Sequence, residues 1–442
     1  MATSTTAPPV ILSQGAPAGF ASLLEAFRGR LERELTAWLA AKRAAAAAAG
    51  VDEAADLIGA LAGLMIQGGK RLRPALVYFT NRACGGRTDA QALPLALATE
   101  FLHTYLLIHD DIMDHAELRR GQPAAHVRFS DAHRERGFQG DADDFGRSVA
   151  ILLGDLAHTY AVELFTSLPP GAPNAAALTA CFSAMCEEVI GGQYLELLVA
   201  QRRGMASPAG DDSAAAGAAA GSDPERQQRE RLLLRVLRLK SGRYTAERPI
   251  QLGALLAGAQ PPLLAALSRY GVAVGEAFQL QDDLLGIFGD AGTVGKPVGA
   301  DLQEGKFTFL VHHALAAATP AERNTIEAAL GNHALSSSEV VRVRAIMERT
   351  GARHAVTDMV AERLRTARAA LAQITQIIQI TQITEITADL TSPPLASPPL
   401  AGGRAPHAPN APHAGAPAAA AARAEGQLFL AGLLDDLWGR EQ

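Results

Sequence analysis

Two clusters of aspartates lie within apolar stretches of this 442-residue chain. Asp110, Asp111 and Asp114 belong to the run YLLIHDDIMD, and Asp282 and Asp283 belong to FQLQDDLLGIFGD. Like charges four residues apart repel on a helix face, and carboxylates beside a buried face lose hydration. A divalent cation removes both penalties, and Mg²⁺ completes its oxygen shell with water and substrate phosphates. Solvated acids at a helix end would explain a lone pair better than two clusters, so we predict that Mg²⁺ and a polyphosphate are held between them.

Four sets of basic residues accompany the acidic clusters. They are the run GGKRLRP at 68–74, Arg119-Arg120-Gly121, Lys240-Ser241, and Lys296 with Lys306. Arginine offers phosphate a planar two-point contact, and lysine offers a mobile point charge. Any one set alone is more often a solvated surface, but cations follow each acidic cluster closely along the chain. We therefore predict a metal site for one diphosphate beside a basic site for another.

Motifs for a protein nucleophile or a nucleotide are missing from the sequence. It contains no GxSxG, no GxGxxG followed by an acid, no Walker lysine loop and no histidine pair at metal-binding spacing. Four histidines occur between 103 and 126, and we interpret only His103 as a polar site residue. The pattern favours leaving-group chemistry, in which metals and cations stabilise a departing diphosphate while an apolar cavity excludes water.

Helices are the elements predicted to position these residues. Apolar residues recur at spacings of three and four, as in Leu23, Phe27, Leu31 and Leu35, and no run alternates like a strand. Aromatic residues make up only 5% of the chain. The sequence therefore predicts an all-α fold.

One catalytic domain with low-complexity additions is the predicted organisation. We expect a flexible segment at 1–19, a catalytic domain at 20–373 with a loop insertion at 204–224, a low-complexity linker at 374–425, and a last helix at 426–442 that belongs to the catalytic domain. The linker includes Ile-Thr-Gln-like triplets at 374–387. They are compatible with an extension of the preceding helix, but a strict period of three drifts off one helical face.

Composition excludes several functional classes. The net charge is −6, which disfavours a cationic surface for nucleic acid or anionic lipid. Three cysteines without a paired spacing favour a reducing compartment. We found no unbroken apolar run of membrane-spanning length and no basic start of a signal peptide, so we expect a cytoplasmic protein without stable membrane insertion.

Taken together, the two aspartate runs, GGKRLRP, RRG and GKPVGADLQEGK resemble the motifs of trans-isoprenyl diphosphate synthases (polyprenyl synthetases). The closest resemblance is to bacterial geranylgeranyl diphosphate synthases, over about residues 20–370. It implies an isoprenoid synthase-type helical bundle around a deep central cavity, usually a homodimer. It also implies Mg²⁺-dependent joining of isopentenyl diphosphate to an allylic diphosphate.

The resemblance implies a role for each motif residue. The metal ligands would be Asp110, Asp114 and Asp282, and Asp111 and Asp283 would support them from adjacent positions. The allylic diphosphate and its cation would be held by Arg119, Lys240, Ser241, Gln279 and Lys296, with Lys306 also binding substrate. Isopentenyl diphosphate would be bound by Gly69, Lys70, Arg73, His103 and Arg120. The chain departs from many relatives at Gly286, where they carry a third aspartate.

Product length is predicted from the residues below the first aspartate cluster. Tyr105 precedes Asp110 by five residues, about 7.5 Å along a helix, and Leu106 is not aromatic. In the family, a single aromatic residue five positions before the first aspartate of this cluster accompanies the twenty-carbon product. We therefore expect geranylgeranyl diphosphate. The alternatives are a farnesyl or longer-chain synthase, a non-catalytic helical partner subunit, which would usually lose motif carboxylates, and a class I terpene cyclase, which needs no Lys70 or Arg73.

Overall fold

The computed structural model describes residues 18–86, 89–168, 172–201, 224–289, 299–391 and 416–439. The helices within them are α1 (Ala18–Ala48), α2 (Asp52–Met65), α3 (Leu72–Ala83), α4 (Asp89–Met113), α5 (Ala125–Glu135), α6 (Ala142–Thr166), α7 (Ala175–Gln201), α8 (Pro224–Val236), the π-helix η2 (Leu237–Glu247), α9 (Arg248–Leu256), α10 (Pro261–Phe288), α12 (Ala300–Gln303), α13 (Phe309–Ala317), α14 (Pro320–Ala329), α15 (Ser337–Arg349), α16 (Ala352–Thr391) and α17 (Ala416–Gly439). In these ranges the strands are limited to β1 (Leu118–Arg119) and β2 (Gln122–Pro123), which pair antiparallel. The predicted all-α class is confirmed.

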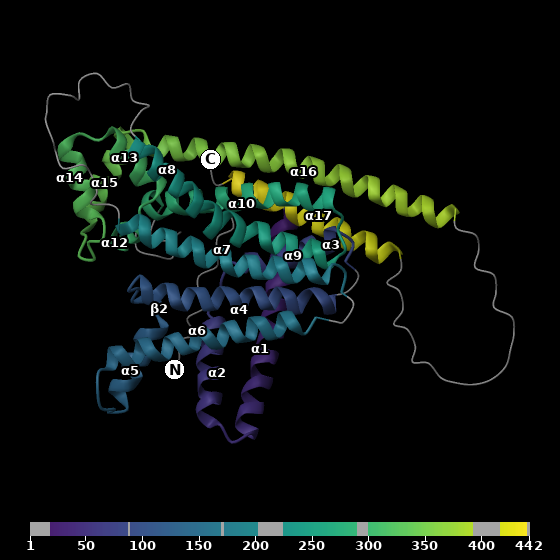
Figure 1. Ribbon diagram of the computed structural model, residues 1–442, viewed down its shortest axis with the longest axis horizontal. Coiled ribbons are helices and arrows are strands. Elements are labelled where there is room, and N and C mark those ends of the chain that lie inside the picture. The colour runs from purple at the N-terminus through teal and green to yellow at the C-terminus, as the bar shows by residue number, and fades with distance from the viewer. Residues whose placement is uncertain are drawn as a thin grey trace.

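Helix α10 forms the centre of the bundle. It packs against α16, η2, α9 and α17, and its Tyr270 side chain is fully buried. Figure 1 shows α16 running along one side of the bundle, while the α1–α2 pair projects from the opposite side. The carboxyl end of α10 carries the second aspartate cluster, so a rigid core helix positions half of the predicted site.

The C-terminal helix α17 is tied into this core. Tyr270 donates its hydroxyl to the Leu430 carbonyl at 2.6 Å, and Gln281 Nε2 donates to the Leu437 carbonyl at 2.6 Å. Phe429 stacks on Phe79 of α3 with ring centroids 4.2 Å apart. These buried contacts support the prediction that the last helix belongs to the catalytic domain.

Both ends of the predicted 374–425 linker lie inside helices, which corrects its bounds. Helix α16 continues through the triplets to Thr391, where Ile374 and Ile378 are buried and Ile380 and Ile383 are exposed. The isoleucine side chains thus drift off the packed face as their period of three requires, but the helix continues to Thr391. Its threonine hydroxyls donate to carbonyls four residues earlier, as Thr381 does to Ile377. Helix α17 begins at Ala416 because alanine is the strongest helix former. Residues 1–17 and 202–223, which include most of the predicted N-terminal segment and insertion, lie outside the described ranges.

Two helices of the described part are long and apolar enough to cross a membrane by length and composition alone. They are α6 and α7. The most apolar 18-residue stretch of α6 is 39% buried, and that of α7 is 33% buried. Neither helix contains an unbroken apolar run of that length, because isolated polar residues interrupt it. Two such helices are weak evidence for a membrane span, since a core helix passes the same test.

Candidate active site

The first aspartate cluster closes helix α4, and its three carboxylates have different surroundings. Asp110 and Asp114 lie one turn apart, and the Asp114 N–H donates to the Asp110 carbonyl at 2.8 Å. Asp111 is only 3% exposed and accepts hydrogen bonds from Arg119, including one from Nε at 2.8 Å. Burial opposes the charge of Arg119, but its hydrogen bonds to the Asp111 carboxylate and the charge of that carboxylate raise the pKa of this guanidinium overall. Asp111 and Arg119 therefore form an ion pair that braces the turn after α4.

Asp110 and Asp114 each face a lysine. Lys240 Nζ lies 3.5 Å from Asp110 Oδ1, and Lys306 Nζ lies 3.6 Å from Asp114 Oδ2. Burial, together with the neighbouring Asp110 carboxylate, raises the pKa of Asp114 to about 6. The two carboxylates repel each other as the sequence indicates, and the lysines offset only part of that repulsion.

The second aspartate cluster lies in the last two turns of α10. Asp282 Oδ1 is 3.3 Å from Lys70 Nζ, and Asp283 accepts a hydrogen bond from Gln279 Nε2 at 2.8 Å. Burial and the nearby carboxylate of Asp301 hold the pKa of Asp283 well above its usual range. A second buried concentration of negative charge therefore lies at this end of the bundle.

Helix η2 links the two clusters and shows that they converge. Its Lys240 contacts Asp110 of α4, while the adjacent Ser241 donates its hydroxyl to Gln279 Oε1 on α10 at 2.9 Å. Lys306 contacts Asp114 and also acts electrostatically on Asp283. Residues about 170 positions apart in sequence are therefore brought together by η2 and Lys306, as expected if the two clusters clamp metal ions and a diphosphate between them.

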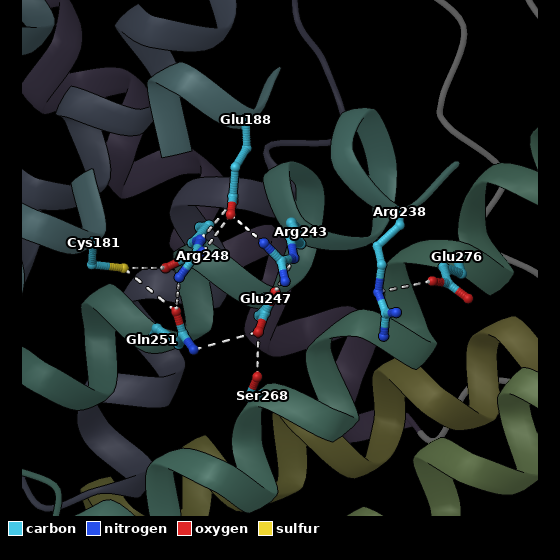
Figure 2. A network of polar contacts seen from close by, with 9 residues as sticks. All are labelled: Cys181, Glu188, Arg238, Arg243, Glu247, Arg248, Gln251, Ser268 and Glu276. Carbon is cyan, nitrogen blue, oxygen red and sulfur yellow. Dashed lines mark hydrogen bonds and ion pairs between the residues drawn. The ribbon is translucent and has the colours of Figure 1, made fainter. Parts of the chain in front are cut away.

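The π-helical geometry of η2 is held by close packing and by charge. A Cβ placed on Gly275 would lie 2.7 Å from the Gly242 carbonyl, so glycine lets η2 approach α10. On the other side, Arg243 and Arg248 both donate to Glu188 of α7 (Figure 2). The Glu247 carboxylate of η2 accepts a hydrogen bond from Ser268 of α10. These contacts fix the segment that presents Lys240 and Ser241, and π-helical turns are frequent at functional sites.

The residues assigned to isopentenyl diphosphate gather beside this clamp. Arg73 Nη2 donates to Thr245 at 2.7 Å, and Arg120 donates to the Gly68 carbonyl next to Gly69. Burial and the charges of Arg73 and Arg120 hold the pKa of His103 well below its usual range. His103 is therefore neutral and lies among cations, and Lys70 reaches from the same loop to Asp282. The structure thus brings this predicted set together.

Arg71 differs from its basic neighbours because its side chain turns into the core. It is 4% exposed, and it donates to Glu100 of α4 and to the Met65 carbonyl. Its φ of 49° is left-handed, which reverses its side chain relative to those of Lys70 and Arg73. We interpret Arg71 as a structural cation within an otherwise open basic run.

Sequence reasoning missed three acids that contribute to the site. Glu196 of α7 pairs with Lys240, Glu304 lies 2.5 Å from Lys306, and Asp301 acts on Asp283. Glu304 and Asp301 belong to the quoted motif GKPVGADLQEGK, where the acids accompanying the lysines were a signal. Glu196 has apolar residues on both sides in α7, and the Gly191-Gly192 pair before it was the nearest signal.

The residues predicted to set product length lie about one turn before Asp110 in α4. The Tyr105 ring is 4.8 Å from that of His109 and 5.1 Å from that of His158 on α6. Leu106 packs partly buried against the core.

Lys296 lies outside the described ranges. The deep cavity stays a prediction. The cavity of about 460 Å³ beside the β1–β2 hairpin, lined by Ile112, His115 and His126 among others, lies away from the two clusters' lysines.

The donor set fits a hard divalent cation. Asp110, Asp114 and Asp282 offer carboxylate oxygens, the ligands that Mg²⁺ prefers. Among the described residues, no three carboxylate, histidine or cysteine side chains already form a complete ion cage. Mg²⁺ in proteins usually takes one or two carboxylates and completes its shell with water and phosphate oxygens.

Comparison with known proteins gives a consistent family. The family model for polyprenyl synthetase matches residues 56–347. Geranylgeranyl diphosphate synthase of Mycobacterium tuberculosis is 32% identical over 301 residues, which is 68% of this chain and 73% of that protein. Geranylfarnesyl diphosphate synthase of Aeropyrum pernix is 33% identical over 300 residues, covering 67% and 80%.

A solved structure supports the same assignment. Geranylgeranyl pyrophosphate synthase from Corynebacterium glutamicum, complexed with isoprenyl diphosphate and magnesium, is similar with a TM-score of 0.70 and 32% identity, covering 79% of this chain and 93% of that one. Both the family match and the fold rest on the region that contains the two converging aspartate clusters. The chain therefore belongs to the polyprenyl synthetase family and is a trans-prenyltransferase.

Proposed function

We propose that this protein is a Mg²⁺-dependent synthase that condenses isopentenyl diphosphate with allylic diphosphates and releases mainly geranylgeranyl diphosphate. The observation that carries the proposal is the convergence of the two aspartate clusters. Lys306 pairs with Asp114 and acts on Asp283, and the adjacent Lys240 and Ser241 of η2 contact Asp110 and Gln279. The relatives make products of different lengths, so the twenty-carbon product is the finer part of the proposal.

The proposed reaction is ionisation of the allylic carbon–oxygen bond followed by attack of the isopentenyl double bond. Bound Mg²⁺, held by Asp110, Asp114 and Asp282, would neutralise charge on the departing diphosphate. Lys240 and Lys306 add fixed positive charge beside the same oxygens, where a water-poor site strengthens it. The Gln279 amide, oriented by Ser241 and Asp283, is placed to steady the cation or the diphosphate.

The second substrate is proposed to bind in the basic pocket next to this clamp. Arg73, Arg120 and Lys70 supply cations there, and neutral His103 can donate a hydrogen bond without adding charge. The proton lost after carbon–carbon bond formation would go to the released diphosphate. This proposal requires no protein nucleophile.

Tyr105 is proposed to be the floor that ends elongation. Its ring lies about 7.5 Å along α4 from Asp110 and is wedged near His158 of α6. Replacing Tyr105 by alanine is expected to shift products beyond twenty carbons, whereas Leu106→Phe adds a second aromatic ring and is expected to shift them toward fifteen. Chromatography of products from purified protein, labelled isopentenyl diphosphate and three allylic starters measures both shifts. An unchanged distribution in Tyr105→Ala would remove this tyrosine as the floor.

A homodimer in the cytoplasm is part of the proposal, and an exposed apolar stripe on each of α6 and α7 supports it. Ile151 and Leu152 of α6 are 45% and 59% exposed, and Ile190 and Tyr194 of α7 are 51% and 62% exposed. Burying these stripes against a second copy would also account for the apolar character of both helices. Sedimentation of Leu152→Glu/Tyr194→Glu should show monomers where the unaltered chain shows dimers. A variant that remains dimeric would exclude this surface.

A further inference from the structure

Glu188 of α7 bridges two arginines at the carboxyl end of η2. Its carboxylate accepts from Arg248 Nε at 2.8 Å, from Arg248 Nη2 at 2.6 Å and from Arg243 Nη1 (Figure 2). The side chains of Glu188 and Arg248 are only 15% and 16% exposed. Exposed ion pairs contribute little to stability, whereas loss of one partner from a buried pair is costly. This bridge is therefore expected to hold η2 firmly to α7.

The two arginines stand five residues apart, which is the hydrogen-bond spacing of a π-helix. The Arg248 N–H donates to the Arg243 carbonyl, so the backbone closes a π-helical turn between the same two residues. In an α-helix, side chains three or four positions apart share a face, whereas the side chain five positions on turns away. One carboxylate that accepts from both arginines therefore fits the π-helical register better than the α-helical one.

Helix α7 contacts η2 at two further positions, each one turn along. A Cβ placed on Gly192 would lie 3.0 Å from the Lys240 backbone nitrogen, and the Glu196 carboxylate pairs with the Lys240 ammonium group. Positions 188, 192 and 196 are spaced by four and therefore share one face of α7. Glu188 thus holds the end of η2 against the same face that supports Lys240.

The register of η2 decides where Lys240 and Ser241 point. In the present register Lys240 reaches Asp110 of α4, and Ser241 donates to Gln279 of α10. With 3.6 residues in an α-helical turn, a change of register by one residue rotates a side chain by about 100°. Such a rotation would turn both groups away from their partners. Because π-helical turns are rare, contacts from outside the helix are expected to maintain this one.

We propose that Glu188 is a positioning residue, which locks η2 in its π-helical register and thereby directs Lys240 at the diphosphate of the allylic substrate. The inference rests on the proposed function, since that function gives Lys240 its substrate. Glu188 acts through the backbone of η2 and not by contact with the reacting atoms.

A double-mutant cycle between Glu188 and Lys240 tests the inference. The variants of the full chain are Glu188→Gln, Lys240→Gln and the two combined, with Glu348→Gln as the matched control. Glu348 also pairs with an arginine, Arg353 at 3.0 Å, but its side chain is 55% exposed. The readouts are kcat for condensation at saturating substrate and the affinity for inorganic diphosphate with Mg²⁺, measured by calorimetry. Thermal unfolding verifies that each variant is folded at the assay temperature.

Glu188→Gln is expected to lower kcat about tenfold or more and to weaken diphosphate binding, since small displacements of a catalytic group are costly. In the Lys240→Gln background the same change should alter either readout by less than about threefold, because the group that Glu188 positions is already gone. Glu348→Gln should behave as the unaltered chain does. A merely structural role would give the same factor in both backgrounds. That result, or a kcat in Glu188→Gln within about threefold of the unaltered chain, would overturn the inference.

Arg243→Gln replaces Glu188→Gln in the cycle if the latter does not fold. Arg243 is 35% exposed, and its removal leaves Glu188 paired with Arg248. The loss of kcat should again depend on Lys240, and a loss that does not would also overturn the inference. If the unaltered chain makes no prenyl product with any starter, the proposed function fails instead, and the cycle in diphosphate binding still decides the role of Glu188.

Discussion

Replacing Arg71 by methionine should destabilise the fold by about 3–5 kcal/mol, the typical loss when one partner of a buried ion pair is removed. Arg71 and Glu100 are 4% and 3% exposed, and the Arg71 guanidinium also donates to the Met65 carbonyl. Methionine keeps much of the packing volume but leaves the Glu100 carboxylate without its cation in the core. Typical domains are stable by only about 5–15 kcal/mol, so the loss is a large share of the total.

The double variant Arg71→Met/Glu100→Met distinguishes the ion pair from simple packing. With both charges gone, no buried charge is left unpaired, and stability should return to within about 1–2 kcal/mol of the unaltered chain or exceed it. Arg134→Met is the matched control, because Arg134 is 53% exposed and pairs with solvated acids. That variant should change stability by less than about 1 kcal/mol.

Urea unfolding at one fixed protein concentration, followed by circular dichroism and fluorescence, measures these differences. Condensation by the double variant should persist, because Arg71 faces the core and not the substrates. A loss below about 1 kcal/mol in Arg71→Met, or a double variant as unstable as the single one, would refute the assignment of Arg71 as a structural cation.

Two further predictions concern the core and helix η2. His312 is 2% exposed, and burial followed by the charge of His313 lowers its pKa to about 4. The neutral ring therefore stabilises the fold above its unfolded pKa near 6.5, and up to about 3 kcal/mol is lost as pH falls from 6.5 through 4. His312→Leu should flatten that part of the stability profile measured by urea unfolding, and an unaltered slope would contradict it. Gly275→Ala should push η2 from α10, because its Cβ would lie 2.7 Å from the Gly242 carbonyl. We expect kcat to fall about tenfold or more, since small displacements of catalytic groups are costly. Gly191→Ala, which meets nothing within 4 Å, should leave kcat unchanged, and equal rates in both variants would refute the role of this close approach.

The acidic clusters could be predicted from sequence because their geometry is local. Asp110 and Asp114 share a face in any helix, and the apolar residues around them make the repulsion informative. Convergence of the two clusters could only be hypothesised, since it depends on how η2 brings Lys240 and Ser241 between α4 and α10. A π-helix has no simple sequence signal, and here it depends on close packing at Gly275 and on the Glu188 ion pairs.

In the basic run GGKRLRP, by contrast, the sequence did not reveal which cation is structural and which faces the site. Lys70, Arg71 and Arg73 look equivalent in sequence, but one φ of 49° sends Arg71 toward Glu100 while its neighbours reach Asp282 and Thr245. The pairing of Arg71 with Glu100 goes with a left-handed backbone conformation that the sequence does not reveal. The structure of the triplets in α16 could not be settled from the sequence for a related reason, because drift from the packed face does not by itself end a helix.

The balance of charge between the two aspartate clusters indicates that tight diphosphate binding requires divalent ions. Three lysines in the described part of the site already contact carboxylates: Lys240 with Asp110 and Glu196, Lys306 with Asp114 and Glu304, and Lys70 with Asp282. A diphosphate entering alone would meet more carboxylates than cations, and opposing charges in a partly buried site interact strongly. Additional positive charge from divalent ions reverses that balance and frees the lysines to turn toward phosphate oxygens. Calorimetric titration with inorganic diphosphate should therefore show firm binding with Mg²⁺ and at least about tenfold weaker binding with a chelator, a difference of about 1.4 kcal/mol or more. Equal affinity under both conditions would mean that the lysines alone hold the anion.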